Sequence, residues 1–268
     1  MIQTEVVLEA LNVLCHAGVE RPEDGLECDA SGGRSMKEVT IHDFIPLALC
    51  GRRSRNQHVA GANPDWESDF SLPNDIRKRG DGRLGLQPNY NWSKSHLDPR
   101  FDYDFTKLND TRVYFRGGEK YKRPCGWQRF ALKVLDEFGD NAWLGNQFRS
   151  TQSVSGEWPV SYHGTQEQFV EAIIGENYKK GPGKHYGLGI YSTPNIDIAQ
   201  KYAVEFTANS TKKKYKVIMQ NRINPEERLI CNRKDFWLVP IDERTSLEEE
   251  KEIVRKAIRP YGLLLKEV

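Results

Sequence analysis

The stretch WPVSYHGTQEQF (residues 158–169) contains the corner on which the predicted fold depends. Residues 158–162 have the composition of a strand, and Thr165 followed three residues later by Gln168 is typical of a helix N-terminus. His163 and Gly164 therefore lie at a strand-to-helix corner, where enzymes often present polar groups. Alone, such a histidine is more often a turn or core residue, so its role depends on the rest of the chain.

The overall composition gives no sign of a nucleic-acid-binding or membrane protein. The chain has 268 residues, enough to bury a sizeable core, and its 39 basic and 38 acidic residues leave a net charge of +1. Its apolar runs are far shorter than the roughly 20 residues that span a bilayer. The five cysteines are scattered and never spaced C-x-x-C, which argues against a disulfide framework or a zinc cluster. We expect a cytoplasmic or nuclear protein with no membrane partner and no secretory signal.

The first predicted region, residues 1–100, is poorly defined. It contains a helix-like segment around 6–14 and a strand-like segment at 39–49. From residue 51 the composition becomes basic and glycine-containing, without sustained periodicity. This part is either a solvated linker or an arm that binds nucleic acid, and its interspersed acidic residues weaken the second interpretation.

The second predicted region, residues 101–157, is a helical lead-in that packs on the domain after it. Its clearest segment is 127–138, where apolar residues recur with the period of an amphipathic helix and Gly139 follows. The apolar positions are Trp127, Phe130, Ala131, Val134, Leu135 and Phe138. The Arg-Gly-Gly corner at 116–118 is a weaker candidate for contact with an anion.

The third predicted region, residues 158–268, is the most regular and forms the expected catalytic domain. Strands are expected at 158–162, 189–192, 215–223, 236–241 and 261–266. Short helices lie between them: one begins after Thr165, one is capped by Thr193 with Pro194 at its first position, and one is capped by Ser246. Because these elements lack the regular rhythm of a parallel sheet, we expect an α+β fold with a mainly antiparallel sheet.

Several common sites are excluded by their spacing. GPGKHYG (181–187) has the glycines of a phosphate-binding loop, but His185 stands where that loop requires serine or threonine. No G-x-G-x-x-G follows a predicted strand, no G-x-S-x-G is present, and no two histidines are spaced H-x-x-x-H. A Rossmann cofactor site, a serine hydrolase and a metal site are therefore not expected.

Taken together, three motifs resemble the ADP-ribosyltransferase domain of the poly(ADP-ribose) polymerase family. That family has a strand ending in His-Gly-Thr or His-Gly-Ser, then Gly-x-Gly-Ile-Tyr, then a helix with a second tyrosine. YHGTQEQFVEAII (162–174) matches the first part, YGLGIYST (186–193) the second and DIAQKYA (197–203) the third. The resemblance covers roughly residues 158–268.

The resemblance implies a split antiparallel β-sandwich with short flanking helices that uses NAD+ as a co-substrate and no metal. The NAD+-binding residues that it implies are His163, Gly164, Thr165, Tyr186, Gly189, Tyr191, Ser192 and Tyr202. These residue types suit the ligand. Tyr191 and Tyr202 offer aromatic faces to the cationic nicotinamide ring, and the Gly164 backbone offers a donor and an acceptor to its carboxamide. His163 is expected to donate a hydrogen bond to a ribose hydroxyl.

The third catalytic residue, after His163 and Tyr191, is predicted to be Asp235. In the resembled family a glutamate begins this later strand, and a carboxylate there stabilises an oxocarbenium-like transition state. The segment KDFWLVP (234–240) has no glutamate, and a one-residue shift in register would place Phe236 at the third position instead. In the family, departure from glutamate goes with mono- rather than poly-ADP-ribosyl transfer.

The resulting hypothesis is an NAD+-dependent mono-ADP-ribosyltransferase. It would pass ADP-ribose to a protein or nucleic-acid acceptor and release nicotinamide. Two alternatives stay open. The short loop at 179–185 would admit water, which favours an NAD+ glycohydrolase. Ala199 stands where the family often has a serine that bonds the carboxamide, and this change favours a non-catalytic module that binds ADP-ribose or a partner protein.

Overall fold

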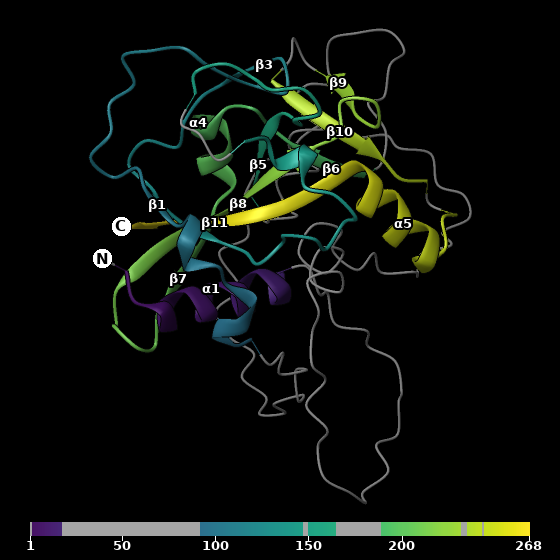
Figure 1. The fold of residues 1–268 in the computed structure, drawn as a ribbon. Helices are drawn as coiled ribbons and strands as arrows, with labels where there is room; N and C mark the ends of the chain where they lie inside the picture. Colours follow the sequence, from purple (N-terminus) through teal and green to yellow (C-terminus); the bar gives the residue numbers. More distant parts are fainter. Residues whose placement is uncertain (1, 18–91, 147–149, 165–188, 232–234, 243) are drawn as a thin grey trace, which may run out of the picture.

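The structure is a computed structural model that describes residues 2–17, 92–146, 150–164, 189–231, 235–242 and 244–268 (Figure 1). Several expectations lie outside these residues: the strand at 39–49, the basic arm, the helix after Thr165, the loop at 179–185, and the site residues Thr165 and Tyr186. The described part is a mixed α+β structure with mostly antiparallel sheets, as the pattern of elements predicted.

The largest sheet is built around two long strands near the C-terminal end of the described chain. Its strands lie in the order β1-β4-β11-β8-β5, and β7 also pairs with β8; every pairing is antiparallel. Their bounds are β1 Tyr103–Asp104, β4 Gln128–Ala131, β5 Val160–His163, β7 Val204–Thr207, β8 Lys214–Ile223 and β11 Ile258–Glu267. Strand β11 lies in the middle of this sheet and crosses the centre of Figure 1.

A second sheet carries Gly189, Tyr191 and Ser192 of the second motif. It consists of β6 (Gly189–Ser192), β10 (Phe236–Pro240) and β9 (Leu229–Cys231), in the order β6-β10-β9. An isolated bridge between Tyr162 and Thr193 joins the end of β6 to β5, so the two sheets meet beside His163. A separate hairpin is formed by β2 (Tyr114–Arg116) and β3 (Glu119–Tyr121).

The helices of the described residues are short and lie around the sheets. They are α1 (Thr4–Ala17), α4 (Ile196–Ala199) and α5 (Leu247–Ala257), with single 3-10 turns η1 (Lys94–His96), η2 (Pro99–Phe101), η3 (Ala142–Leu144) and η4 (Gln200–Tyr202). The predicted cap of α5 is confirmed, because the Ser246 side chain accepts from the Glu249 N–H. No described helix is long and apolar enough to cross a membrane.

Helix α1 belongs to the main core rather than to a separate N-terminal region. Its buried face joins the cluster that includes inward-facing residues of β8, β10, β11 and α5. The α1 residues in that cluster are Val6, Val7, Ala10, Leu11 and Leu14. The carboxylate of Glu9 also accepts from the backbone N–H groups of Asn209 and Ser210, after β7. The start of the chain therefore helps to complete the core of its C-terminal half.

The predicted helix at 127–138 is wrong, and the described residues of the lead-in at 101–157 contain no α-helix. Its first part is β4, which lies between β1 and β11, and residues 135–138 form turns. A strand that lies between two others can be buried on both of its faces. Here the consecutive residues Phe130, Ala131 and Leu132, which point alternately to the two faces, are all buried. Pairing with β11 therefore outweighs the helical spacing of the apolar residues.

The helix predicted to begin at Thr193 begins two residues later than expected. Asn195 is its N-cap, with its side chain accepting from the Asp197 N–H at 3.1 Å. Thr193 instead exchanges two backbone hydrogen bonds with Tyr162, of 2.8 and 3.0 Å. The bridge between the two sheets thus holds Thr193 in an extended segment and moves the start of α4.

Candidate functional site

His163 lies at the end of β5, where the first and second motifs meet. The residue is 7% exposed, and its Nδ1 atom lies 2.6 Å from the carbonyl oxygen of Tyr191. Because a carbonyl oxygen only accepts, Nδ1 carries the hydrogen and donates it. In the neutral ring, Nε2 is then an acceptor. In its neutral form, the second ring nitrogen of His163 is therefore an acceptor and carries no hydrogen to donate.

The surroundings of His163 favour its neutral form. Burial lowers the pKa of the imidazole below its usual value of 6.5, and the hydrogen bond to the Tyr191 carbonyl opposes that shift only in part. At neutral pH the ring therefore carries one hydrogen, held on Nδ1 by the bond to Tyr191.

We expect His163 to make the stability of the protein depend on pH between its unfolded and folded pKa values. Above pH 6.5 the ring is neutral in both the folded and the unfolded state, so it does not make the free energy of unfolding depend on pH. Below pH 6.5 the unfolded chain binds a proton that the folded chain resists, so the free energy of unfolding falls. His163→Asn keeps an N–H donor but does not titrate. Urea unfolding at pH 7.5, 6.5 and 5.5 should show a smaller loss for the variant than for the wild type; an equal or larger loss would contradict this assignment.

The two tyrosines of the motifs lie in one apolar cluster. Tyr191 is buried with Cys231, Phe236 and Leu238, and Tyr202 packs against this group. Tyr191 and Leu238 are directly opposite in the pairing of β6 with β10, so their side chains lie on one face of the second sheet. The structure thus brings Tyr191 and Tyr202 together, and it brings the His163 ring to the backbone of Tyr191.

Gly164 is required by a close approach to the third motif. A Cβ atom at this position would lie 2.3 Å from the carbonyl oxygen of Tyr202, closer than real Cβ contacts allow. The absence of a side chain therefore lets the end of β5 pack directly on the turn η4. Gly189 has a similar origin: its φ is 148°, and a Cβ atom would lie 2.0 Å from the Val239 carbonyl oxygen. Both glycines are explained by packing of the backbone.

The strand register favours Phe236 over Asp235 at the third position. Leu238 is opposite Tyr191, so Phe236, two residues earlier, lies on the same face of β10. Phe236 is buried in the Tyr191 cluster. Asp235 is exposed in the turn before the strand. It is one residue before Phe236, and adjacent positions point to opposite faces of a strand. On the face of β10 that meets Tyr191, the third position therefore holds the aromatic ring of Phe236 and not the predicted carboxylate of Asp235.

Ser192 and Ala199 have different surroundings from those of the tyrosines. Ser192 pairs with Trp237, so its side chain lies on the face of β6 opposite to that of Tyr191. Its buried Oγ atom has no hydrogen-bond partner in the described ranges. Ala199 is buried in the cluster with Tyr162 and Ile196. Neither side chain therefore lies in the Tyr191 cluster.

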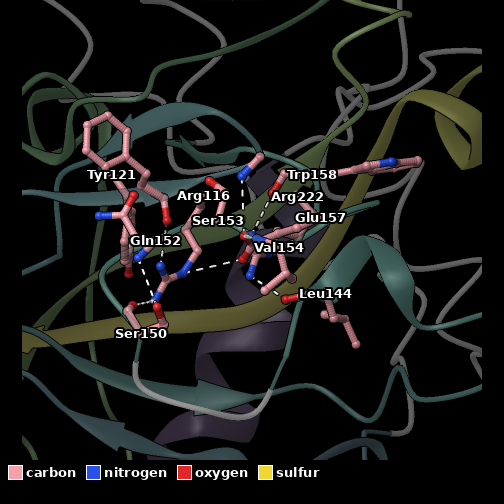
Figure 2. Close-up of polar contacts among 12 residues, drawn as sticks. Arg116, Tyr121, Leu144, Ser150, Gln152, Ser153, Val154, Glu157, Trp158 and Arg222 are labelled. Carbon is pink, nitrogen blue, oxygen red and sulfur yellow. Dashed lines mark hydrogen bonds and ion pairs between the residues drawn. The ribbon is translucent and has the colours of Figure 1, made fainter.

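A buried ionic network, missed in the sequence, lies next to these strands. Figure 2 shows Arg116 and Arg222 pointing toward the carboxylate of Glu157, at 3.4 and 3.1 Å. Arg222 also donates to the carbonyl oxygens of Trp158 and Leu144, at 2.6 and 2.5 Å. The Arg116 guanidinium is thus already paired with Glu157 and with backbone carbonyls. This pairing argues against the predicted contact of residues 116–118 with an anion.

No group of three or more histidine, cysteine or acidic side chains that could hold a metal occurs among the residues whose positions are described. No protein-family model matches the chain, and no curated protein matches it. The proposal of a function therefore rests on the motifs and on their geometry.

Proposed function

We propose that the chain is an NAD+-dependent mono-ADP-ribosyltransferase that releases nicotinamide and passes ADP-ribose to a macromolecular acceptor. The observation that carries this proposal is the hydrogen bond from His163 to the Tyr191 carbonyl, because it joins two motifs that are 28 residues apart. The packing of Tyr202 against Gly164 and against the Tyr191 cluster adds the third motif. Described residues of all three motifs, His163, Gly164, Tyr191 and Tyr202, therefore lie close together.

In the proposed reaction, NAD+ lies against this junction. The faces of Tyr191 and Tyr202 attract the cationic nicotinamide ring, and the Gly164 backbone bonds its carboxamide. His163 Nε2 accepts from a ribose hydroxyl and orients the sugar. The bond between the ribose and the nicotinamide nitrogen breaks, and its electron pair leaves with nicotinamide. A nucleophile of the acceptor then bonds to the same ribose carbon and loses its proton to solvent.

Phe236 supports transfer of single ADP-ribose units. Elongation in the resembled family uses the glutamate at the third position to activate the next hydroxyl. An aromatic side chain cannot accept that proton, and it gives an oxocarbenium-like state no anionic partner. We therefore expect slow mono-transfer and no polymer.

The presence of Phe236 at the third position also favours a second candidate function, a non-catalytic module that binds NAD+ or ADP-ribose. Phe236 lies in the Tyr191 cluster, and Ala199 is buried away from it. Among the described residues, this cluster offers aromatic faces but no carboxylate. Such a site suffices for binding without turnover. The two functions predict different products, so one experiment separates them.

We expect wild-type protein incubated with labelled NAD+ to release nicotinamide and to label itself or a component of a cell lysate. His163→Ala should lower the rate at least about 100-fold, because a misplaced sugar costs about that factor. Asp235→Ala, which changes an exposed turn residue, should match the wild type. Nicotinamide and bound label are both quantified by chromatography.

Each other outcome selects a different function. Nicotinamide with free ADP-ribose and no labelled macromolecule would identify an NAD+ glycohydrolase. Saturable binding of a nicotinamide analogue without turnover would identify the binding module. Equal rates for wild type and His163→Ala would remove His163 from the mechanism.

A further inference from the structure

A pair of polar side chains is enclosed in the interior next to His163. Ser161 of β5 and Asn221 of β8 are directly opposite in the antiparallel register, and both are 0% exposed. Residues 161 and 163 point to the same face of β5, so this pair shares a face of the sheet with His163. The neighbours on that face of β8, Met219 and Ile223, are fully buried apolar side chains.

The polar atoms of this pair are not satisfied by the surrounding protein. Ser161 Oγ and both side-chain amide atoms of Asn221 are buried and have no hydrogen-bond partner within the described part of the chain. Ser192 Oγ, one residue from the bridge that joins β6 to β5, is a third side chain in the same condition. Leaving such a group unpaired costs about 1–3 kcal/mol, so several of them in one place require an explanation.

A direct bond between the two side chains cannot satisfy them. The Asn221 amide has two N–H donors and one acceptor oxygen, whereas the Ser161 hydroxyl has one donor. Any single contact therefore leaves part of the amide unpaired. The missing partner must both donate and accept, and it must be uncharged, because burying an isolated ion in apolar surroundings is far more costly. A divalent cation is excluded as well, since neither side chain supplies a carboxylate.

We propose that Ser161 and Asn221 bind an internal water molecule between β5 and β8, beside His163, with Ser192 as a further partner. Buried water typically makes about three hydrogen bonds to groups of this kind. The water fixes the amide orientation of Asn221 and ties the two strands together where β5 ends. This inference does not depend on the proposed reaction.

The site is tested first on the wild-type protein by nuclear magnetic resonance. In the 15N-labelled full chain, we expect the Asn221 side-chain amide protons to show cross-relaxation with water of the sign that marks a long-lived bound molecule. A slowly exchanging Asn221 amide without that cross-relaxation would overturn the proposal, because it would show that the amide is closed off from water.

Substitutions provide an independent readout. If water joins the two side chains, Ser161→Ala and Asn221→Leu should each lower the urea midpoint of unfolding, since each removes a bonded group. If the atoms are unpaired, the same changes remove buried polar groups that cost stability, and the midpoints should rise. A rise in both would overturn the proposal. Ser155→Ala, at an exposed position, is the matched control and should leave the midpoint unchanged.

Discussion

Glu157→Gln is expected to lower the free energy of unfolding by about 3–5 kcal/mol, the usual loss when one partner of a buried ion pair is removed. The Glu157 side chain is 4% exposed, and the guanidinium groups of Arg116 and Arg222 both point toward it. It also accepts from the backbone N–H groups of Gly117 and Val154. Glutamine keeps the size of the side chain and removes its charge, so two arginines lose their counterion together.

The matched control is Glu267→Gln, which breaks the ion pair with Lys213. Both of these side chains are half exposed, so the loss should be at most about 1 kcal/mol. The measurement is urea unfolding of both variants at neutral pH. A loss for Glu157→Gln no larger than that for Glu267→Gln would show that the network contributes no more than a surface pair.

Gly164→Ala is expected to reduce the proposed transferase activity strongly and to lower the free energy of unfolding by about 1–3 kcal/mol, the usual range for overpacking. The added methyl group would meet backbone atoms of Tyr202, with the carbonyl oxygen at 2.3 Å and the carbonyl carbon at 2.5 Å. Backbone cannot rotate away as a side chain can. The turn that carries Tyr202 must therefore move away from the end of β5, and with it the second aromatic face.

Gly262→Ala is the control for this change. A Cβ atom there would meet the flexible side chain of Arg129 at 3.0 Å, and the backbone angles need no glycine. We expect a smaller loss of stability and unchanged nicotinamide release. The test compares urea midpoints and nicotinamide release for the two variants. If Gly164→Ala released nicotinamide as fast as Gly262→Ala does, the contact with Tyr202 would have no part in the reaction.

Elements with a strong local pattern were predictable from the sequence. The alternating residues of β8 and the apolar runs of β10 and β11 were assigned correctly, and Ser246 with Glu249 marked the start of α5. Strand β4 was not predictable, because its helical spacing was a coincidence. What makes it a strand is the pairing with β11, more than a hundred residues later.

The candidate site was predictable to a similar degree. The motifs predicted that His163 and Tyr191 belong to one site, and in the structure a ring nitrogen of His163 contacts the backbone oxygen of Tyr191. The third position depended on the register of β10 against β6, which a single sequence leaves open by one residue. Arg222 and Glu157 could not be paired in advance, because no local pattern links two residues 65 positions apart.

The central place of β11 has a consequence for how the protein reaches its fold. β11 follows every other described strand in the chain, yet it separates β4 from β8 in the large sheet. During synthesis, β4 and β8 emerge from the ribosome before the strand that joins them. The edges of β4 and β8 that face β11 remain unpaired until β11 has been synthesised, so the large sheet cannot be completed before then. Pairings of such long sequence separation go with slow folding, and unpaired strand edges in that interval favour aggregation of the incomplete chain.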